Sequence, residues 1–143
     1  MTVQKLETQT TLVNDRVQFS GKARNNPSIL MDYFPPLGDG EGYTGLEVLL
    51  LSLSGCSGTA IKVLLRKMNK TVEGLTVETS GIRQEEAPFA FSRIDLVYTL
   101  KSPDVSVADL EKVIRLTETS MCPVWAMLKG NVEIIENHVL IKT

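Results

Sequence analysis

The stretch from Thr44 to Lys70 constrains the fold more than any other part of the sequence. No charged residue occurs between Val48 and Ile61, and apolar residues fall on every side of a helical wheel. A helix that is apolar all round is normally buried all round. The uncharged run is shorter than the roughly 20 residues that a helix needs to span a bilayer. The stretch therefore predicts a central helix that is buried on every side within a soluble domain.

The start and the middle of this helix carry separate signals. Thr44 and Glu47 stand three residues apart, which is the spacing of a capping box. Gly55 and Gly58 flank Cys56 and its neighbour, and each glycine weakens a helix by about 1 kcal/mol relative to alanine. We therefore expect a kink at Gly55. Cys56 would then lie in the first turn of the second half, where unpaired amides and the helix dipole favour a thiolate.

Length, charge and cysteine count exclude several classes of protein. A chain of 143 residues predicts a single domain over residues 1–143. A net charge of −2 without a basic cluster argues against a nucleic-acid partner. The polar N-terminus lacks the apolar core of a secretory signal, so we expect a cytoplasmic protein with reduced thiols and no membrane partner. Two cysteines and one histidine, without a CxxC motif, cannot form a tetrahedral zinc site within one chain.

The remaining segments predict an α+β fold with strands before and after the central helix. Cys122 precedes a proline, and proline favours the first position of a helix, so Cys122 is expected at the N-terminus of a short helix. The order of strands, helix, hairpin, helix and strand is typical of the α+β class. The expected segments are strands within residues 1–32, a loop over 33–43, a hairpin over 72–101, a helix over 106–121 and a final strand over 132–142.

The two cysteines admit two interpretations. Free cysteines most often behave as small apolar core residues, and both could do so here. Alternatively they form a redox pair, since both expected placements lower the pKa of a thiol. A thiolate can attack the O–O bond of a peroxide and become a sulfenic acid, which a second thiol then condenses with to form a disulfide. A disulfide between such a pair needs Cα atoms roughly 4.4–6.8 Å apart. The separation of the two cysteines in the sequence does not give this distance.

Glu47 and Arg24 each have a structural and a functional interpretation. Glu47 completes the capping box, and its carboxylate could also orient an arginine above the thiol. Arg24 lies in a turn, where an exposed side chain is the ordinary outcome. If the turn instead folds onto Cys56, its guanidinium would stabilise the thiolate and the leaving oxyanion.

The central stretch LEVLLLSLSGCSGTAIKVLLRKM, followed later by SMCPVWAML, resembles the OsmC/Ohr family. This family contains the osmotically inducible protein C and the organic hydroperoxide resistance proteins. Its pattern is a glutamate that opens a buried helix, a first cysteine approached by small residues, and a second cysteine followed by proline. The resemblance covers essentially the whole chain. Gly45, Leu46 and Ser57 are closer to the OsmC-like branch than to the hydroperoxide-resistance branch.

The resemblance implies an OsmC-like fold, with antiparallel sheets around a long buried helix in an intertwined homodimer whose sites lie at the subunit interface. It implies that Cys56 is the peroxidatic thiol and Cys122 the resolving thiol. Glu47 would hold the active-site arginine, for which Arg24 is the best match and Arg16 the second candidate. An external dithiol, of the lipoyl type in this family, would reduce the disulfide without any bound cofactor.

These observations predict a thiol-dependent peroxidase that reduces organic hydroperoxides. An apolar environment would favour alkyl or lipid hydroperoxides over hydrogen peroxide, because it buries the alkyl tail at about 0.8 kcal/mol per methylene. The alternative is a non-enzymatic protein of the same fold that binds a small molecule or senses oxidation. Consumption of more than one equivalent of peroxide distinguishes the two.

Overall fold

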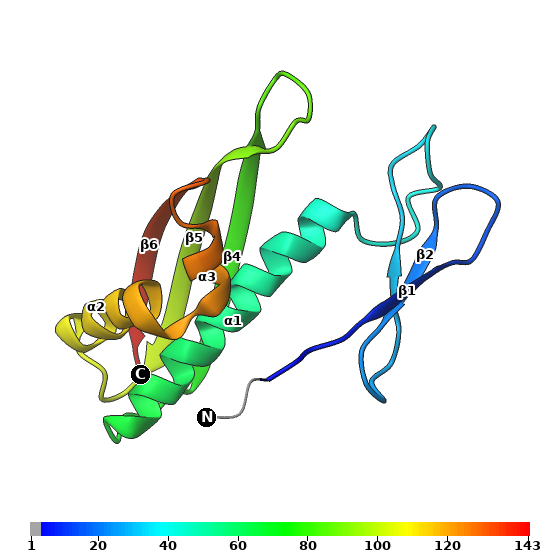
Figure 1. The fold of residues 1–143 in the computed structure, drawn as a ribbon. Helices are drawn as coiled ribbons and strands as arrows, with labels where there is room; N and C mark the ends of the chain where they lie inside the picture. Colours follow the sequence, from blue (N-terminus) through cyan, green and yellow to red (C-terminus); the bar gives the residue numbers. More distant parts are fainter. Residues whose placement is uncertain (1–3) are drawn as a thin grey trace. The chain divides into compact units, whose positions relative to one another are not determined.

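A computed structural model describes residues 4–143 and divides the chain into two compact units (Figure 1). The first unit ends at Leu49 and the second begins at Leu50, so the boundary falls within helix α1 (Gly45–Lys67). Strands and helices occur in the order expected of an α+β chain. The α+β prediction is thus confirmed.

The first unit is a small antiparallel sheet of three strands. Its strands are β1 (Gln9–Leu12), β2 (Phe19–Lys22) and β3 (Ile29–Met31), paired in the order β1-β2-β3. In the turn after β1, the Asn14 side chain accepts hydrogen bonds from the backbone N–H groups of Arg16 and Gln18. Between residues 4 and 49 no large apolar side chain is buried. This sheet therefore has no hydrophobic core of its own.

The loop over residues 33–43 is organised by a buried carboxylate that the sequence did not single out. Asp32 accepts hydrogen bonds from the backbone N–H groups of Tyr33, at 2.7 Å, and of Glu41, at 3.1 Å. Burial would raise the pKa of Asp32, but these bonds and one from the Asp39 backbone together lower it. Asp32 thus stays ionised and ties both ends of the loop to the end of β3.

Helix α1 begins with the predicted capping box and runs without a break. The Thr44 N–H donates to the Glu47 carboxylate at 2.8 Å, and the Glu47 N–H donates to the Thr44 hydroxyl at 3.2 Å. The kink expected at Gly55 is absent, so that prediction was wrong. A Cβ at Gly58 would lie 3.4 Å from Val77 of the neighbouring sheet, so this glycine permits close packing. Packing against the sheet outweighs the low helix propensity of the two glycines.

Within a single chain, α1 is buried on one face, which corrects the prediction of a helix buried on all sides. The buried residues follow helical spacing and form one stripe: Leu53, Ser57, Ala60, Ile61 and Leu65. Other apolar residues remain open, with Leu51 52% and Val63 38% exposed. One sheet can cover only one side of a helix, which is the physical reason for the difference.

By length and hydropathy, α1 would also qualify as a membrane-spanning helix. The sequence-based length argument, which counted only the uncharged run, did not anticipate this. The core helix of a soluble protein passes the same test, and the buried stripe of α1 faces protein rather than lipid. We therefore interpret α1 as a core helix.

The second unit contains a three-stranded sheet with helices on one face (Figure 1). Strands β4 (Gly74–Arg83) and β5 (Phe91–Ser102) form the predicted antiparallel hairpin. Strand β6 (Glu133–Lys142) instead pairs parallel to β5, so the expectation of purely antiparallel sheets was wrong here. The chain between β5 and β6 forms helices, and such a helical crossover is what a parallel pair requires.

The crossover consists of α2 (Val107–Leu116), a π-helical turn η1 (Thr117–Met121) and α3 (Pro123–Leu128). Ser106 and Asp109 cap α2 reciprocally. The single helix expected over residues 106–121 therefore ends in a wider π-helical turn. The buried side chains Leu110, Val113, Ile114 and Trp125 bring this crossover into the core.

Candidate functional site

Cys122 lies at the N-cap of α3, as the sequence predicted. Its sulfur accepts a hydrogen bond from the Trp125 N–H at 3.4 Å, and Pro123 occupies the first helical turn. Its own N–H donates to the Thr117 carbonyl at 3.0 Å, across the π-helical turn. Cys122 is only 3% exposed. Short π-helical segments are frequent at functional sites. Here the segment η1 leads directly into the buried Cys122.

The structure brings Cys56 and Cys122 together. Both are free thiols, with Cys56 half-buried and Cys122 buried. Burial raises the pKa of Cys122 to about 11, and a hydrogen bond with the Cys56 side chain acts in the same direction. Backbone N–H groups of Trp125 and Val124 lower the pKa of Cys122 but do not offset burial. The expectation that the N-cap position would lower this pKa was therefore wrong.

Cys56 lies in the middle of the unbroken helix α1 rather than at the start of a second half. All backbone amides around it belong to a continuous helix, so unpaired amides of a helix terminus do not face its sulfur. That part of the sequence argument was also wrong. What remains is a half-exposed thiol next to a buried, protonated one.

Tyr98 completes this environment, and the sequence analysis assigned it no role. Its side chain is fully buried on β5, and within residues 4–143 its hydroxyl is the buried side-chain polar atom that makes no hydrogen bond of ordinary length and angle. Leaving a buried hydroxyl unpaired costs about 1–3 kcal/mol. Ser57, which follows Cys56, is also fully buried, and a weak hydrogen bond with its side chain lowers the pKa of Tyr98 against the larger effect of burial.

Glu47, Arg24 and Arg16 all belong to the first unit. Arg24 stands in the turn between β2 and β3 with a left-handed backbone (φ 54°), and its side chain has no hydrogen-bond or ion-pair partner among residues 4–143. Arg16 lies between β1 and β2, and its guanidinium donates to the Asp39 carboxylate and to the Pro36 carbonyl. Arg24 is thus a guanidinium free to bind, whereas Arg16 is already engaged by the loop that precedes α1.

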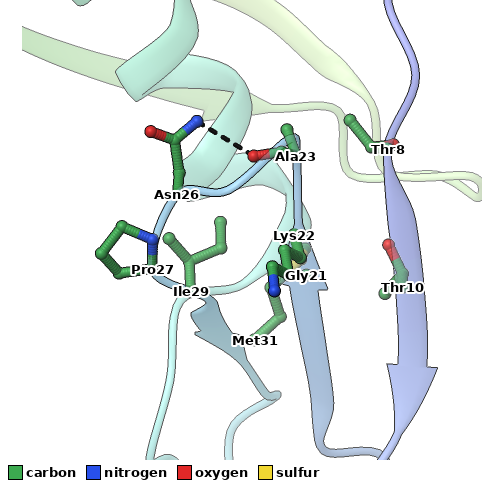
Figure 2. Close-up of a pocket in the computed structure, with 9 residues that line it drawn as sticks. All are labelled: Thr8, Thr10, Gly21, Lys22, Ala23, Asn26, Pro27, Ile29 and Met31. Atoms are coloured by element: carbon green, nitrogen blue, oxygen red, sulfur yellow. Dashed lines mark hydrogen bonds between the residues drawn. The ribbon is translucent and has the colours of Figure 1, made fainter.

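Two pockets of the first unit bear on the search for a site. The loop over residues 33–43 and Glu47 line one of about 450 Å³, so this loop borders a pocket. The other, of about 320 Å³, lies on the sheet beside the Asn26 side chain, which donates to the Ala23 carbonyl at 2.9 Å (Figure 2). The residues lining this second pocket include no cysteine, histidine or carboxylate. The pocket therefore has no thiol, and no imidazole or carboxylate that could act as a general base.

His138 forms a separate polar cluster in the second unit. Its ring nitrogens lie 2.9 Å from the Glu136 carboxylate and 3.6 Å from that of Glu111. Over the described chain, residues 4–143, no group of three or more histidine, cysteine or acidic side chains is arranged to hold a metal ion. The thiol pair is therefore the strongest candidate for chemistry.

Residues 38–137 match the family model described as OsmC-like protein. The chain belongs to the OsmC-like family. Both cysteine segments lie within the matched range. The family resemblance inferred from the two cysteine segments is thereby confirmed.

Individual proteins and solved structures are similar to this chain. Protein YhfA of Escherichia coli K12 is 28% identical over 123 residues, covering 86% of this chain and 90% of YhfA. A hypothetical protein from Aquifex aeolicus shares the fold with a TM-score of 0.87 and 23% identity, covering 99% of both chains. An organic hydroperoxide resistance protein from Elizabethkingia anophelis superposes with a TM-score of 0.71 and 16% identity, also over 99% of both chains. These structures confirm an OsmC-like α+β fold with a central helix.

Proposed function

We propose that this protein is a thiol-dependent peroxidase that reduces organic hydroperoxides through Cys56 and Cys122. The observation that carries the proposal is the pairing of a half-exposed thiol with a buried thiol whose pKa is about 11. Membership of the family supports it, since related structures include organic hydroperoxide resistance proteins.

The difference between the two thiols assigns their roles. At neutral pH Cys122 keeps its proton, so its sulfur can donate a hydrogen bond to the Cys56 sulfur and stabilise a thiolate there. Cys56 is also the more accessible of the two. Cys56 is therefore the thiol that attacks the substrate, and Cys122 acts second.

The reaction proceeds in two balanced steps. The Cys56 thiolate attacks one oxygen of the hydroperoxide, the O–O bond breaks, and the alkoxide leaves with a proton as the alcohol. Cys56 is then a sulfenic acid, two electrons more oxidised. The Cys122 sulfur attacks the Cys56 sulfur, the S–O bond breaks, and water leaves with the proton from Cys122. An external dithiol, such as a lipoyl-type compound, exchanges with the resulting disulfide and restores both thiols.

Arg24 and Glu47 are proposed to act on the first step. A guanidinium near the Cys56 sulfur would stabilise the thiolate and the alkoxide that leaves. Arg24 is available for this, because its side chain has no partner within residues 4–143. The Glu47 carboxylate has one oxygen engaged in the capping box, which leaves the other oxygen to accept from an arginine.

A second copy of the chain is the proposed partner. The uncovered face of α1 and the coreless sheet of residues 4–49 both expose apolar side chains, including Leu51 and Phe34. Apolar side chains that are exposed together on one surface mark a site of interaction with another protein. We expect a solution mass of about twice 15.8 kDa by light scattering. A monomer at micromolar concentration would contradict the homodimer.

Turnover tests the function directly. Purified protein supplied with excess cumene hydroperoxide and dihydrolipoamide should consume many equivalents of both, whereas a protein that only binds a small molecule or senses oxidation consumes at most one. Protein heated until unfolded is the control for the uncatalysed reaction. Consumption that stops at one equivalent, with the dithiol in excess, would favour the sensing or binding role.

A further inference from the structure

We propose that the pocket lined by the loop over residues 33–43 binds a small organic cation of the quaternary ammonium class. This binding site goes beyond the proposed peroxidase and depends on none of its steps. The pocket has a volume of about 450 Å³. Ligand pockets in proteins usually enclose about 300–1,000 Å³, so a small organic molecule fits.

The sequence around this pocket is acidic throughout. From Leu30 to Glu47 it contains four carboxylates, those of Asp32, Asp39, Glu41 and Glu47, and no lysine, arginine or histidine. Glu41 and Glu47 line the pocket itself. A hollow lined by one sign of charge concentrates ions of the opposite sign. The pocket therefore attracts cations.

The Arg16 guanidinium does not cancel this charge. It also touches the loop, but it is engaged by the Asp39 carboxylate and by the Pro36 carbonyl. Arg16 is not among the residues that line the pocket. The carboxylates of Glu41 and Glu47 thus have no basic side chain beside them in the pocket lining.

Aromatic side chains form much of the remaining wall. Tyr33, Phe34 and Tyr43 line the pocket together with Leu30. The rings of Tyr33 and Phe34 lie 5.5 Å apart between centroids, with their planes inclined by 60°. A cation within about 6 Å of an aromatic ring is attracted by the negative face of the ring. Aromatic rings combined with carboxylates select a weakly hydrated organic cation over a neutral molecule of the same shape.

The loop is held in place before any ligand binds. The Tyr43 N–H donates to the Leu30 carbonyl, and the Asp32 N–H donates to the Tyr43 carbonyl, both at 3.0 Å. A Cβ at Gly42 would lie 2.5 Å from the Leu30 carbonyl oxygen, so only glycine lets the loop approach β3 this closely. The Asp32 carboxylate also accepts from the Glu41 N–H at 3.1 Å. A wall fixed in advance reduces the ordering cost of binding.

Glu41 is the carboxylate on which the test depends. Its Oε2 accepts a hydrogen bond from the Gln18 amide at 3.1 Å, which a glutamine at position 41 can also accept through its amide oxygen. Glu47 is less suitable, because it caps α1 and is assigned to the arginine of the first oxidation step. Glu41 has no part in the proposed reaction, so replacing it separates cation binding from catalysis.

The test compares choline with dimethylbutanol, its neutral analogue in which carbon replaces the charged nitrogen. Both are titrated into reduced full-length protein at constant ionic strength, and binding is followed by ligand-observed NMR. Choline should bind roughly 5- to 30-fold more tightly than the neutral alcohol. Glu41→Gln and Tyr43→Leu should each reduce this preference at least about threefold, while Tyr43→Phe, which keeps the aromatic face, should retain it.

Two controls separate a built site from general attraction to an acidic protein. Glu85→Gln removes the same charge from the loop between β4 and β5, in the second unit, and should leave the preference unchanged. Circular dichroism should show that every variant is folded. Equal affinity for choline and the neutral alcohol overturns the inference, as does an equal loss in Glu85→Gln and Glu41→Gln.

Hydroperoxide turnover measured on the same preparations distinguishes this inference from the proposed function. Turnover with no binding of choline overturns the cation site and leaves the peroxidase standing. Preferential binding of choline by a protein that lacks turnover supports the cation site and contradicts the peroxidase.

Discussion

A Cys56→Ser protein is expected to lose hydroperoxide turnover by about 1,000-fold or more, because a serine hydroxyl is not ionised at neutral pH and attacks the O–O bond poorly. The Cys56 side chain is half-buried in the middle of α1, and oxygen replaces sulfur there with little change of volume. The fold should therefore survive. Initial rates with cumene hydroperoxide and dihydrolipoamide, together with circular dichroism, measure both effects.

Cys122→Ser is the matched control for this variant. It removes the second thiol but leaves Cys56, so one equivalent of peroxide should still be consumed at about the wild-type rate. Turnover beyond that equivalent should then depend on direct reduction of the sulfenic acid by the external dithiol. If Cys56→Ser kept full turnover while Cys122→Ser lost the first oxidation, the assignment of roles to the two cysteines would be reversed.

Replacing Arg24 with alanine is expected to slow oxidation of Cys56 about 100-fold, the effect of removing one donor that stabilises developing charge. The Arg24 guanidinium is otherwise without a partner within residues 4–143, so the change should barely affect stability. Arg24→Lys should restore part of the rate, since it keeps the charge but loses the paired donors of the guanidinium. Single-turnover loss of the Cys56 thiol measures this step alone.

Arg16→Ala is the matched comparison. Arg16 is bound to Asp39 and Pro36, so its loss should loosen the loop over residues 33–43 and lower the melting temperature more than it lowers the rate. A large loss of rate in Arg16→Ala, with none in Arg24→Ala, would show that Arg16 is the active-site arginine. That outcome would leave the chemistry of the cysteine pair intact.

Local patterns predicted most elements of the fold. The capping box at Thr44 and the proline after Cys122 each depend on interactions within a few residues. The prediction of a kink at Gly55 failed because Gly58 packs closely against the sheet. Such packing is a tertiary effect, and local propensity does not report it.

Long-range relations were the part that local patterns missed. Nothing in the residues of β6 distinguishes a parallel from an antiparallel neighbour, because that choice follows from the crossover between β5 and β6. The all-round apolar character of α1 predicted burial on every side, yet one chain supplies a cover for one side only.

The candidate site shows the same limit. The two cysteine segments identified the thiols, and the position of Cys122 at a helix start was predicted correctly. The direction in which the pKa of Cys122 shifts was predicted wrongly. Burial depends on what packs around α3, and it raises this pKa more than two local N–H groups lower it. Tyr98 looked like one more inward residue of an alternating strand. Its place beside Ser57 could be recognised only once the strand was placed beside α1.

The most direct test of the central claim is the intact mass of reduced protein after one equivalent of cumene hydroperoxide, in wild type and in Cys122→Ser. The account predicts a loss of about 2 mass units in wild type, from a disulfide between Cys56 and Cys122. It predicts a gain of about 16 in Cys122→Ser, from a sulfenic acid on Cys56. Unchanged masses with both wild-type thiols still titratable would contradict the peroxidase and favour a binding protein.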